Sequence, residues 1–111
     1  YLTFIAHPTG RLINQRNPYS FNFEEILDAA KANGKALEIN SFPSRLDFDY
    51  SHVKACVKKG VKLVINSDAH SVPHLDFLEF GIAQARRGWA EKGDVLNALS
   101  WKQFEKTVLK K

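Results

Sequence analysis

The sequence predicts an α/β fold of parallel βαβ units, because three short apolar runs alternate with segments of helical periodicity. The runs are residues 2–6, 35–40 and 61–65, and each is followed by polar residues. Right-handed βαβ units bring consecutive strands of this kind into one parallel sheet. A length of 111 residues and a hydrophobic content of 44% fit one globular domain.

The first strand and first helix are marked by local signals. Residues 2–6 form the first apolar run, and Pro8 prevents the strand from continuing. Asn22 is a typical N-cap and has Glu25 at the third position after it, so a helix is expected through about residue 33. Gly34 then supplies the left-handed end of that helix.

The second strand, residues 35–40, has two unlike faces. Leu37 and Ile39 share one face, whereas Glu38 and Asn40 share the other. Strands covered by helices are normally apolar on both faces, and a buried carboxylate is costly unless it is paired or near a metal. Glu38 and Asn40 therefore indicate either a polar site or an internal hydrogen-bond network.

The second helix and third strand follow the same pattern. Asp49 or Ser51 can cap a helix that runs through Lys59. Cys56 lies in the apolar stripe of this helix and is expected to be buried and unreactive. Residues 61–65 form the third strand, which ends in the polar turn that precedes the next helix.

The last third of the chain predicts two more helices. A helix over residues 74–87 would bury the stripe Leu75, Leu78, Ile82 and Ala85. Residues 95–99 suit a short strand or extended segment. Ser100 and Gln103 form a capping box for a final helix, whose expected buried residues are Trp101, Phe104 and Val108.

Composition narrows the functional class. No apolar run approaches the roughly 20 residues needed to span a bilayer, and the chain opens on no signal-peptide pattern. One cysteine excludes an intramolecular disulfide and a cysteine zinc cluster, and suggests weakly a cytoplasmic protein. The net charge of +4 permits a polyanionic partner without requiring one. Because the chain lacks methionine and opens within an expected strand, we expect it to be part of a longer protein.

Candidate chemistry follows all three expected strands. His7 comes after the first, Glu38 and Asn40 end the second, and Asp68 and His70 come after the third. The carboxyl ends of parallel strands meet at one edge, where α/β folds place their sites. Each residue alone has a structural explanation: a satisfied histidine, an internal network or a turn cap. Together they favour a divalent-metal site with oxygen and nitrogen ligands.

Four blocks of sequence carry a family resemblance: Ala6-His7-Pro8-Thr9-Gly10-Arg11, Leu37-Glu38-Ile39-Asn40, Arg45-Leu46-Asp47 and Ser67-Asp68-Ala69-His70. With Ala85-Arg86-Arg87-Gly88-Trp89 added, nearly the whole chain resembles the C-terminal PHP (polymerase and histidinol phosphatase) domain of bacterial family X DNA polymerases. The resemblance implies a distorted seven-stranded TIM-like (β/α) barrel with up to three divalent metals, Mn²⁺ or Zn²⁺ and also Mg²⁺. It implies phosphoester hydrolysis, as a 3′–5′ exonuclease in DNA repair.

The resemblance also assigns roles to residues. It implies that the metal-ligating and catalytic residues are His7, Asp68 and His70, and it places Glu38 and Asn40 beside the metals. The family's opening His-x-His motif and its middle histidine and glutamate ligands have no counterpart in this sequence. Residues 1–111 are therefore expected to be a single partial PHP domain, the C-terminal part of the barrel, and inactive by themselves.

The implied partners are DNA, the N-terminal half of the barrel and the polymerase core. Arg11 and Arg45 follow strands and could hold substrate phosphates, since a guanidinium offers paired donors to an anion. An open sheet edge on a partial barrel also predicts self-association of this chain.

Three alternatives remain. The domain could be a non-catalytic scaffold for a polymerase. It could bind DNA without chemistry through Arg11, Arg45, Arg86 and Arg87, although the last two end an expected helix, where basic residues favour the helix dipole. It could also hydrolyse a phosphomonoester, as a histidinol phosphatase does.

Overall fold

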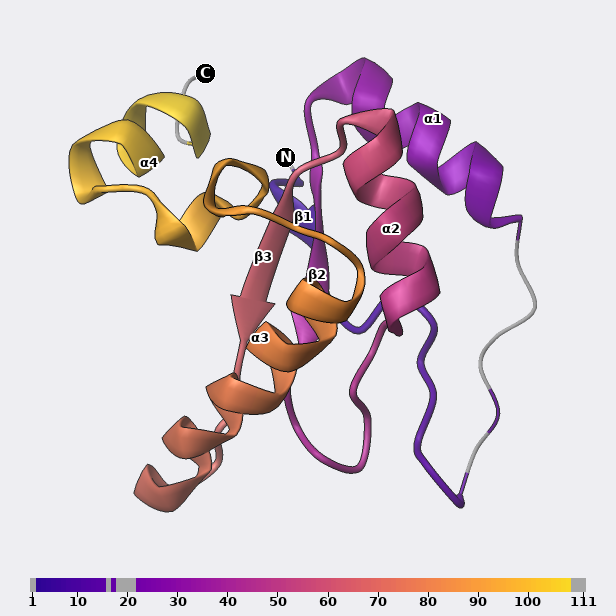
Figure 1. Cartoon of the computed structure of the whole chain (residues 1–111), viewed down its shortest axis with the longest axis vertical. Helices are drawn as coiled ribbons and strands as arrows, with labels where there is room; N and C mark the ends of the chain where they lie inside the picture. The colour runs from indigo at the N-terminus through magenta and orange to yellow at the C-terminus, as the bar shows by residue number, and fades with distance from the viewer. Residues whose placement is uncertain (1, 16, 18–21, 109–111) are drawn as a thin grey trace.

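The computed structural model describes residues 2–15, 17 and 22–108 of the chain. A parallel sheet in the order β1-β2-β3 lies at its centre (Figure 1). The strands are β1 (Phe4–Ile5), β2 (Ala36–Asn40) and β3 (Leu63–Asn66). The parallel βαβ arrangement expected from the sequence is thus confirmed, although the first strand is shorter than residues 2–6.

Four α-helices accompany the sheet in the described part of the chain: α1 (Phe23–Asn33), α2 (Tyr50–Lys59), α3 (Leu78–Arg87) and α4 (Trp101–Val108). The first two begin and end where the sequence predicts. The Asn22 side chain accepts a hydrogen bond from the Glu25 backbone N–H, and Gly34 ends α1 at φ 61°. Asp49 caps α2 in the same way, and Gly60 ends it at φ 80°.

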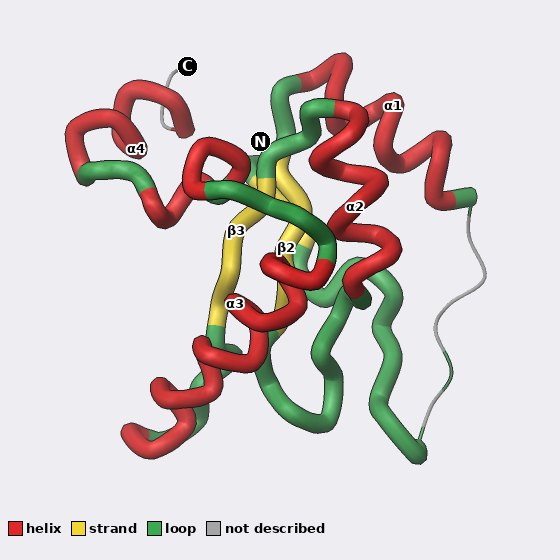
Figure 2. The backbone as a smooth tube through the Cα atoms, in the orientation of Figure 1, coloured by secondary structure: helices red, strands yellow, loops and turns green. Residues whose placement is uncertain are grey.

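Two hydrophobic clusters attach helices to the sheet; α1, α2 and α3 lie close to the strands, whereas α4 lies to one side (Figure 2). One hydrophobic cluster joins α1, α2 and α3 to the sheet face that carries Leu37 and Ile39. A smaller cluster joins Leu96 and the inner side of α4 to the opposite face, around Ala36 and Val64. Because side chains alternate along a strand, Glu38 and Asn40 lie on this second face. Both faces of β2 are therefore buried, and the buried polar residues Glu38 and Asn40 share the second face.

The apolar stripe expected for the third helix is mostly exposed, so the prediction that it is buried is wrong. Leu75, Leu78 and Ile82 are 53%, 37% and 41% exposed, and only Ala85 of the four is buried. Residues 72–77 form a 3₁₀-helix, η1 (Val72–Phe77), before α3 begins. The helix instead packs through Gly81, where an added Cβ would lie 2.0 Å from Ser41 Oγ. A glycine thus sets the contact face, which hydrophobic periodicity alone does not detect.

Two further expectations need correction. Residues 95–99 do not form a strand: Val95 makes one bridge to Leu63, and the chain then enters the 3₁₀-helix η3 (Leu96–Ala98). Another 3₁₀-helix, η2 (Lys92–Asp94), precedes it. The final helix buries less than expected: Trp101 is 68% exposed, and Phe104 and Val108, through which α4 packs, are only half-buried. Among the described residues no helix is long and apolar enough to cross a membrane.

Candidate functional site

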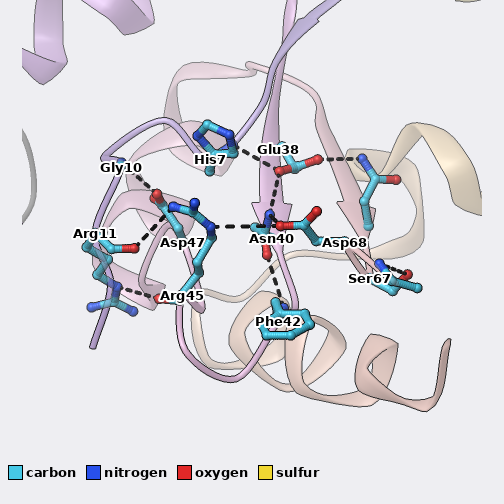
Figure 3. Close-up of polar contacts among 12 residues, drawn as sticks. His7, Gly10, Arg11, Glu38, Asn40, Phe42, Arg45, Asp47, Ser67 and Asp68 are labelled. Atoms are coloured by element: carbon cyan, nitrogen blue, oxygen red, sulfur yellow. Dashed lines mark hydrogen bonds and ion pairs between the residues drawn. The ribbon is translucent and has the colours of Figure 1, made fainter. Parts of the chain in front are cut away.

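Polar residues gather at the carboxyl ends of the three strands (Figure 3). His7 follows β1, Glu38 and Asn40 belong to the end of β2, and Asp68 follows β3. Parallel pairing aligns Asn40 with Asn66, so the last residues of β2 and β3 are neighbours. The structure therefore brings these residues to one edge of the sheet, as the sequence predicts.

Glu38 links all three strands through its carboxylate. Its Oε1 accepts hydrogen bonds from the His7 backbone N–H at 2.9 Å and from Asn40 Nδ2 at 3.2 Å. Its Oε2 accepts one from Asn66 Nδ2 at 2.7 Å. Glu38 is only 5% exposed, so these donors replace the water that a carboxylate requires. The strand ends are thereby held in a fixed relative position.

Asn40 extends this network to Asp68. Its Nδ2 donates to Asp68 Oδ2 at 3.1 Å, and its Oδ1 accepts from the Phe42 backbone N–H at 3.1 Å. Arg45 Nε lies 3.8 Å from the same Asp68 oxygen. Asp68 is thus held by an amide and a guanidinium while its side chain stays 36% exposed.

Asp47 holds the turn that carries His7. This fully buried carboxylate accepts from the Thr9 backbone N–H at 3.0 Å, from Thr9 Oγ1 at 2.8 Å and from the Gly10 backbone N–H at 2.8 Å. Charge-assisted hydrogen bonds of this kind are stronger than neutral ones. The turn after β1 is therefore attached to the loop after β2.

The two arginines strengthen the same connection. Arg11 Nε donates to the Arg45 carbonyl at 2.8 Å, and Arg11 Nη2 donates to the Leu46 carbonyl. In return, Arg45 Nη1 donates to the Arg11 carbonyl at 3.4 Å. The Arg11 guanidinium is therefore engaged with the loop backbone, whereas that of Arg45 also reaches Asp68.

Backbone strain coincides with two of the sequence-predicted site residues. His7 has φ 30° and Asp68 has φ 55°. Both values lie at positive φ, which residues other than glycine rarely adopt. Such conformations persist where the surroundings enforce them, and they concentrate at functional sites. Here Glu38 and Asn40 supply that enforcement, because they bond to the His7 backbone and the Asp68 carboxylate.

His70 lies apart from this network. Its ring centroid is 6.0 Å from that of Phe42, and its backbone N–H donates to His74 Nδ1 at 3.1 Å. Among the described residues, no group of three or more His, Cys, Asp or Glu side chains is placed to hold a metal ion. The donor types suit a metal of mixed ligation, but these residues do not form a complete metal site by themselves.

Three participants in the network were not predicted from the sequence. Asn66 ends β3 with its amide on Glu38, and Asp47 with Thr9 forms the buried anchor of the first turn. Asp47 is part of a motif that the sequence displays, yet its partners lie 37 and 38 residues away. Asn66 could have been found from its position beside Asn40 in a parallel register, once the strands were aligned.

The sequence is similar to two curated proteins, and no protein-family model matches it. It is 43% identical, over 95% of its length, to the DNA polymerase/3′-5′ exonuclease PolX of Bacillus subtilis (strain 168). It is 36% identical, over 63% of its length, to a probable phosphatase of Acetivibrio thermocellus. The matched segment spans 18% of the first protein and 29% of the second.

Proposed function

We propose that this chain provides one side of a metal-dependent phosphoesterase site, because it belongs to the PHP domain of PolX-type DNA polymerases. The reaction proposed is phosphodiester hydrolysis at a 3′ end of DNA, as the name of the Bacillus relative describes. The observation that carries the proposal is the junction of three strand ends through the Glu38 carboxylate. The carboxylate bonds to the His7 backbone and, through Asn40, is connected to the Asp68 side chain, so it would fix the positions of two proposed ligands.

The proposed ligands are His7, Asp68 and His70, with Mn²⁺, Zn²⁺ or Mg²⁺ as the metal. Because the described residues do not complete a metal site, further ligands would come from outside this segment. When bound, divalent metals of this kind lower the pKa of water and neutralise charge on a phosphate. Glu38 and Asn40 then serve to fix the ligands, since residues behind a metal ligand set its orientation and basicity.

Arg45 is the proposed phosphate contact. Its Nε lies 3.8 Å from Asp68 Oδ2 and its side chain is 20% exposed, so an anion at Asp68 would also reach it. Arg11 remains a second candidate, but its Nε and Nη2 already bind carbonyl oxygens of the loop. We therefore expect loss of Arg45 to weaken substrate binding and loss of Arg11 to loosen the loop.

The complete domain is proposed to be a distorted (β/α)₇ TIM-like barrel of which this chain forms the C-terminal part. β1 is an edge strand, and beside it lies a groove of about 220 Å³ lined mainly by apolar residues: Leu2, Ile5, Ile26, Ala29, Ala30, Asn33 and Lys35. An open edge with an apolar groove is where another strand and helix of a barrel would pack. In isolation the same edge would promote self-association of the chain.

A phosphomonoesterase is the second candidate, because the chain is also similar to a protein named as a probable phosphatase. The two activities share the metal chemistry and differ in the substrate that enters. DNA binding without chemistry is less favoured at the end of α3, because the Arg87 guanidinium lies over the Tyr50 ring, 4.3 Å from its centroid. A scaffold without activity is less favoured, because His7 and Asp68 are two of the five described non-glycine residues with positive φ, and such conformations concentrate at functional sites.

Separate assays with two substrates distinguish these functions. The full-length protein would be given a 3′-labelled single-stranded oligonucleotide and histidinol phosphate in separate assays with Mn²⁺. Release of the labelled nucleotide without release of inorganic phosphate from the monoester supports the exonuclease. The reverse pattern supports the phosphatase, and hydrolysis of neither supports the scaffold.

A further inference from the structure

Five aromatic rings form a connected group next to the candidate site. This group, the aromatic shelf, consists of Phe42, His70, His74, Phe77 and Phe80. Phe42 meets His74 and Phe77 edge to face, with centroid distances of 5.1 and 5.3 Å. His74 and Phe77 stack at 5.0 Å with only 20° between their planes, and Phe80 lies 6.0 Å beyond Phe77. Such mutual contacts fix the orientation of the rings.

The shelf is not part of the hydrophobic core. None of its members belongs to either core cluster of the described residues. Phe80 is 39% exposed, His70 is exposed, and Phe42, His74 and Phe77 are half-buried. The chain therefore keeps an ordered group of rings at its surface, where burial against the sheet does not explain them.

The shelf is connected to the candidate site by hydrogen bonds and by short stretches of chain. The Phe42 backbone N–H donates to Asn40 Oδ1, the same side chain that binds Asp68. His70, two residues after Asp68, donates its backbone N–H to His74 Nδ1 at 3.1 Å. Arg45, on the loop that begins with Phe42, reaches Asp68. A ligand with an anionic group at Asp68 and Arg45 would have its next chemical group near the shelf.

We propose that the aromatic shelf stacks an unpaired nucleobase at the 3′ end of single-stranded DNA. This inference rests on the proposed function, which places the scissile phosphate beside Asp68 and Arg45. Every base offers a π face, so stacking on fixed rings holds the terminal nucleotide without selecting its sequence. The Arg45 guanidinium, three residues after Phe42 in the chain, is paired with Asp68. A cation and fixed rings on one loop suit a ligand that carries both an anion and a flat ring, and this combination favours a nucleotide over a purely apolar partner.

The test measures binding of an oligothymidylate that carries 2-aminopurine at its 3′ end, whose fluorescence is quenched by stacking. Chelator in the buffer keeps the DNA intact. A matched oligonucleotide with a 3′-terminal abasic residue measures binding without the base. Phe77→Leu removes the central ring of the shelf and keeps an apolar side chain. Trp101→Leu is the control, because it removes another exposed and stacked ring, on α4 against Phe104.

The wild-type protein is expected to quench the 2-aminopurine and to bind it roughly 5- to 100-fold more tightly than the abasic DNA. Phe77→Leu should abolish that preference, whereas Trp101→Leu should retain it. An unquenched probe, or an equal preference in Phe77→Leu and the wild type, overturns the inference. A circular dichroism melt of each variant confirms that the fold is retained. If the melt shows Phe77→Leu unfolded, Phe80→Leu at the exposed end of the shelf replaces it, with the same criteria.

Three other results are informative. If light scattering shows a dimer that Phe77→Leu dissociates, and the probe is not quenched, the shelf is a contact between copies of the chain and the inference fails. If the full-length protein releases 3′ nucleotides but shows no base preference, the proposed function stands and the stacking inference fails. Quenching without hydrolysis would support the stacking role and contradict the proposed reaction.

Discussion

The Glu38 carboxylate accepts a hydrogen bond from the His7 backbone N–H at 2.9 Å, between residues 31 positions apart in the chain. This contact joins the end of β1 to β2, and the same carboxylate continues to β3 through Asn66. A buried acid therefore connects all three strand ends, and two of the proposed ligands, His7 and Asp68, depend on that connection for their positions.

Replacing Glu38 with glutamine should destabilise the protein. Both carboxylate oxygens accept hydrogen bonds. In glutamine one oxygen becomes an N–H₂ group, which faces at least one of these donors and cannot accept its hydrogen bond. We expect the free energy of unfolding to fall by about 1–3 kcal/mol, the range for an unsatisfied buried group. Urea denaturation measures it, with the exposed Glu105→Gln on α4 as the control. Equal midpoints for the two variants would refute the structural role of Glu38.

Asp47→Asn should loosen the turn that carries His7. The asparagine can no longer accept at both oxygens, although Thr9 and Gly10 donate to both. The expected loss is again about 1–3 kcal/mol of stability. Hydrogen exchange should also become faster at the Thr9 and Gly10 amides than in the wild type. If these two amides keep their protection in a folded variant, Asp47 does not anchor the turn.

Gly81→Ala should disturb the packing of α3 on the sheet. The added Cβ would lie 2.0 Å from Ser41 Oγ and 2.7 Å from Ile65 Cγ2, so the helix must move. Overpacking of this kind costs about 1–3 kcal/mol. Gly93→Ala is the matched control, because nothing lies within 4 Å of its added Cβ, and its stability should stay within about 0.5 kcal/mol of the wild type. Equal melting temperatures for the two variants would contradict the packing of α3 through Gly81.

Cys56 should make stability fall at alkaline pH. Burial raises the pKa of its thiol from 9.0 to about 12, so the folded protein keeps the proton that the unfolded chain releases. This contribution is fully present below pH 9 and is lost as the pH rises toward 12. Between those values the wild type should lose more unfolding free energy than Cys56→Ala does, when both are measured by urea denaturation. Parallel pH profiles would show that the thiol ionises equally in both states.

Local signals predicted the elements that depend on local contacts. Asn22 and Asp49 each bond to backbone N–H groups within three residues, and Gly34 and Gly60 adopt the left-handed conformation within their own helix ends. These interactions are complete within a short segment, so the sequence identifies them. The expected burial of Cys56 is confirmed for a similar reason, since it follows from the apolar stripe of α2.

The misassigned elements depend on distant contacts. The spacing of Ile82 predicted a core residue, but Gly81 faces Ser41 and Ile65, and this choice of face depends on how α3 meets the sheet. In the site, the polar face of Glu38 and Asn40 was visible in the sequence because it broke an apolar pattern. The partnership of Asp47 with Thr9 was not visible, because only the folded chain brings the two loops together.

The most direct test of the proposed phosphoesterase site is the rate of 3′ nucleotide release from single-stranded DNA by the full-length protein with Mn²⁺. Asp68→Ala is compared with Asp76→Ala, which removes an exposed carboxylate of η1. Asp68→Ala should lower the rate by at least roughly 100-fold while both variants fold, because loss of a ligand should cost no less than the roughly 10- to 100-fold that loss of a residue behind a ligand costs. Asp76→Ala should keep the wild-type rate. Equal activity of Asp68→Ala and the wild type would contradict the assignment of the strand ends as the reactive site.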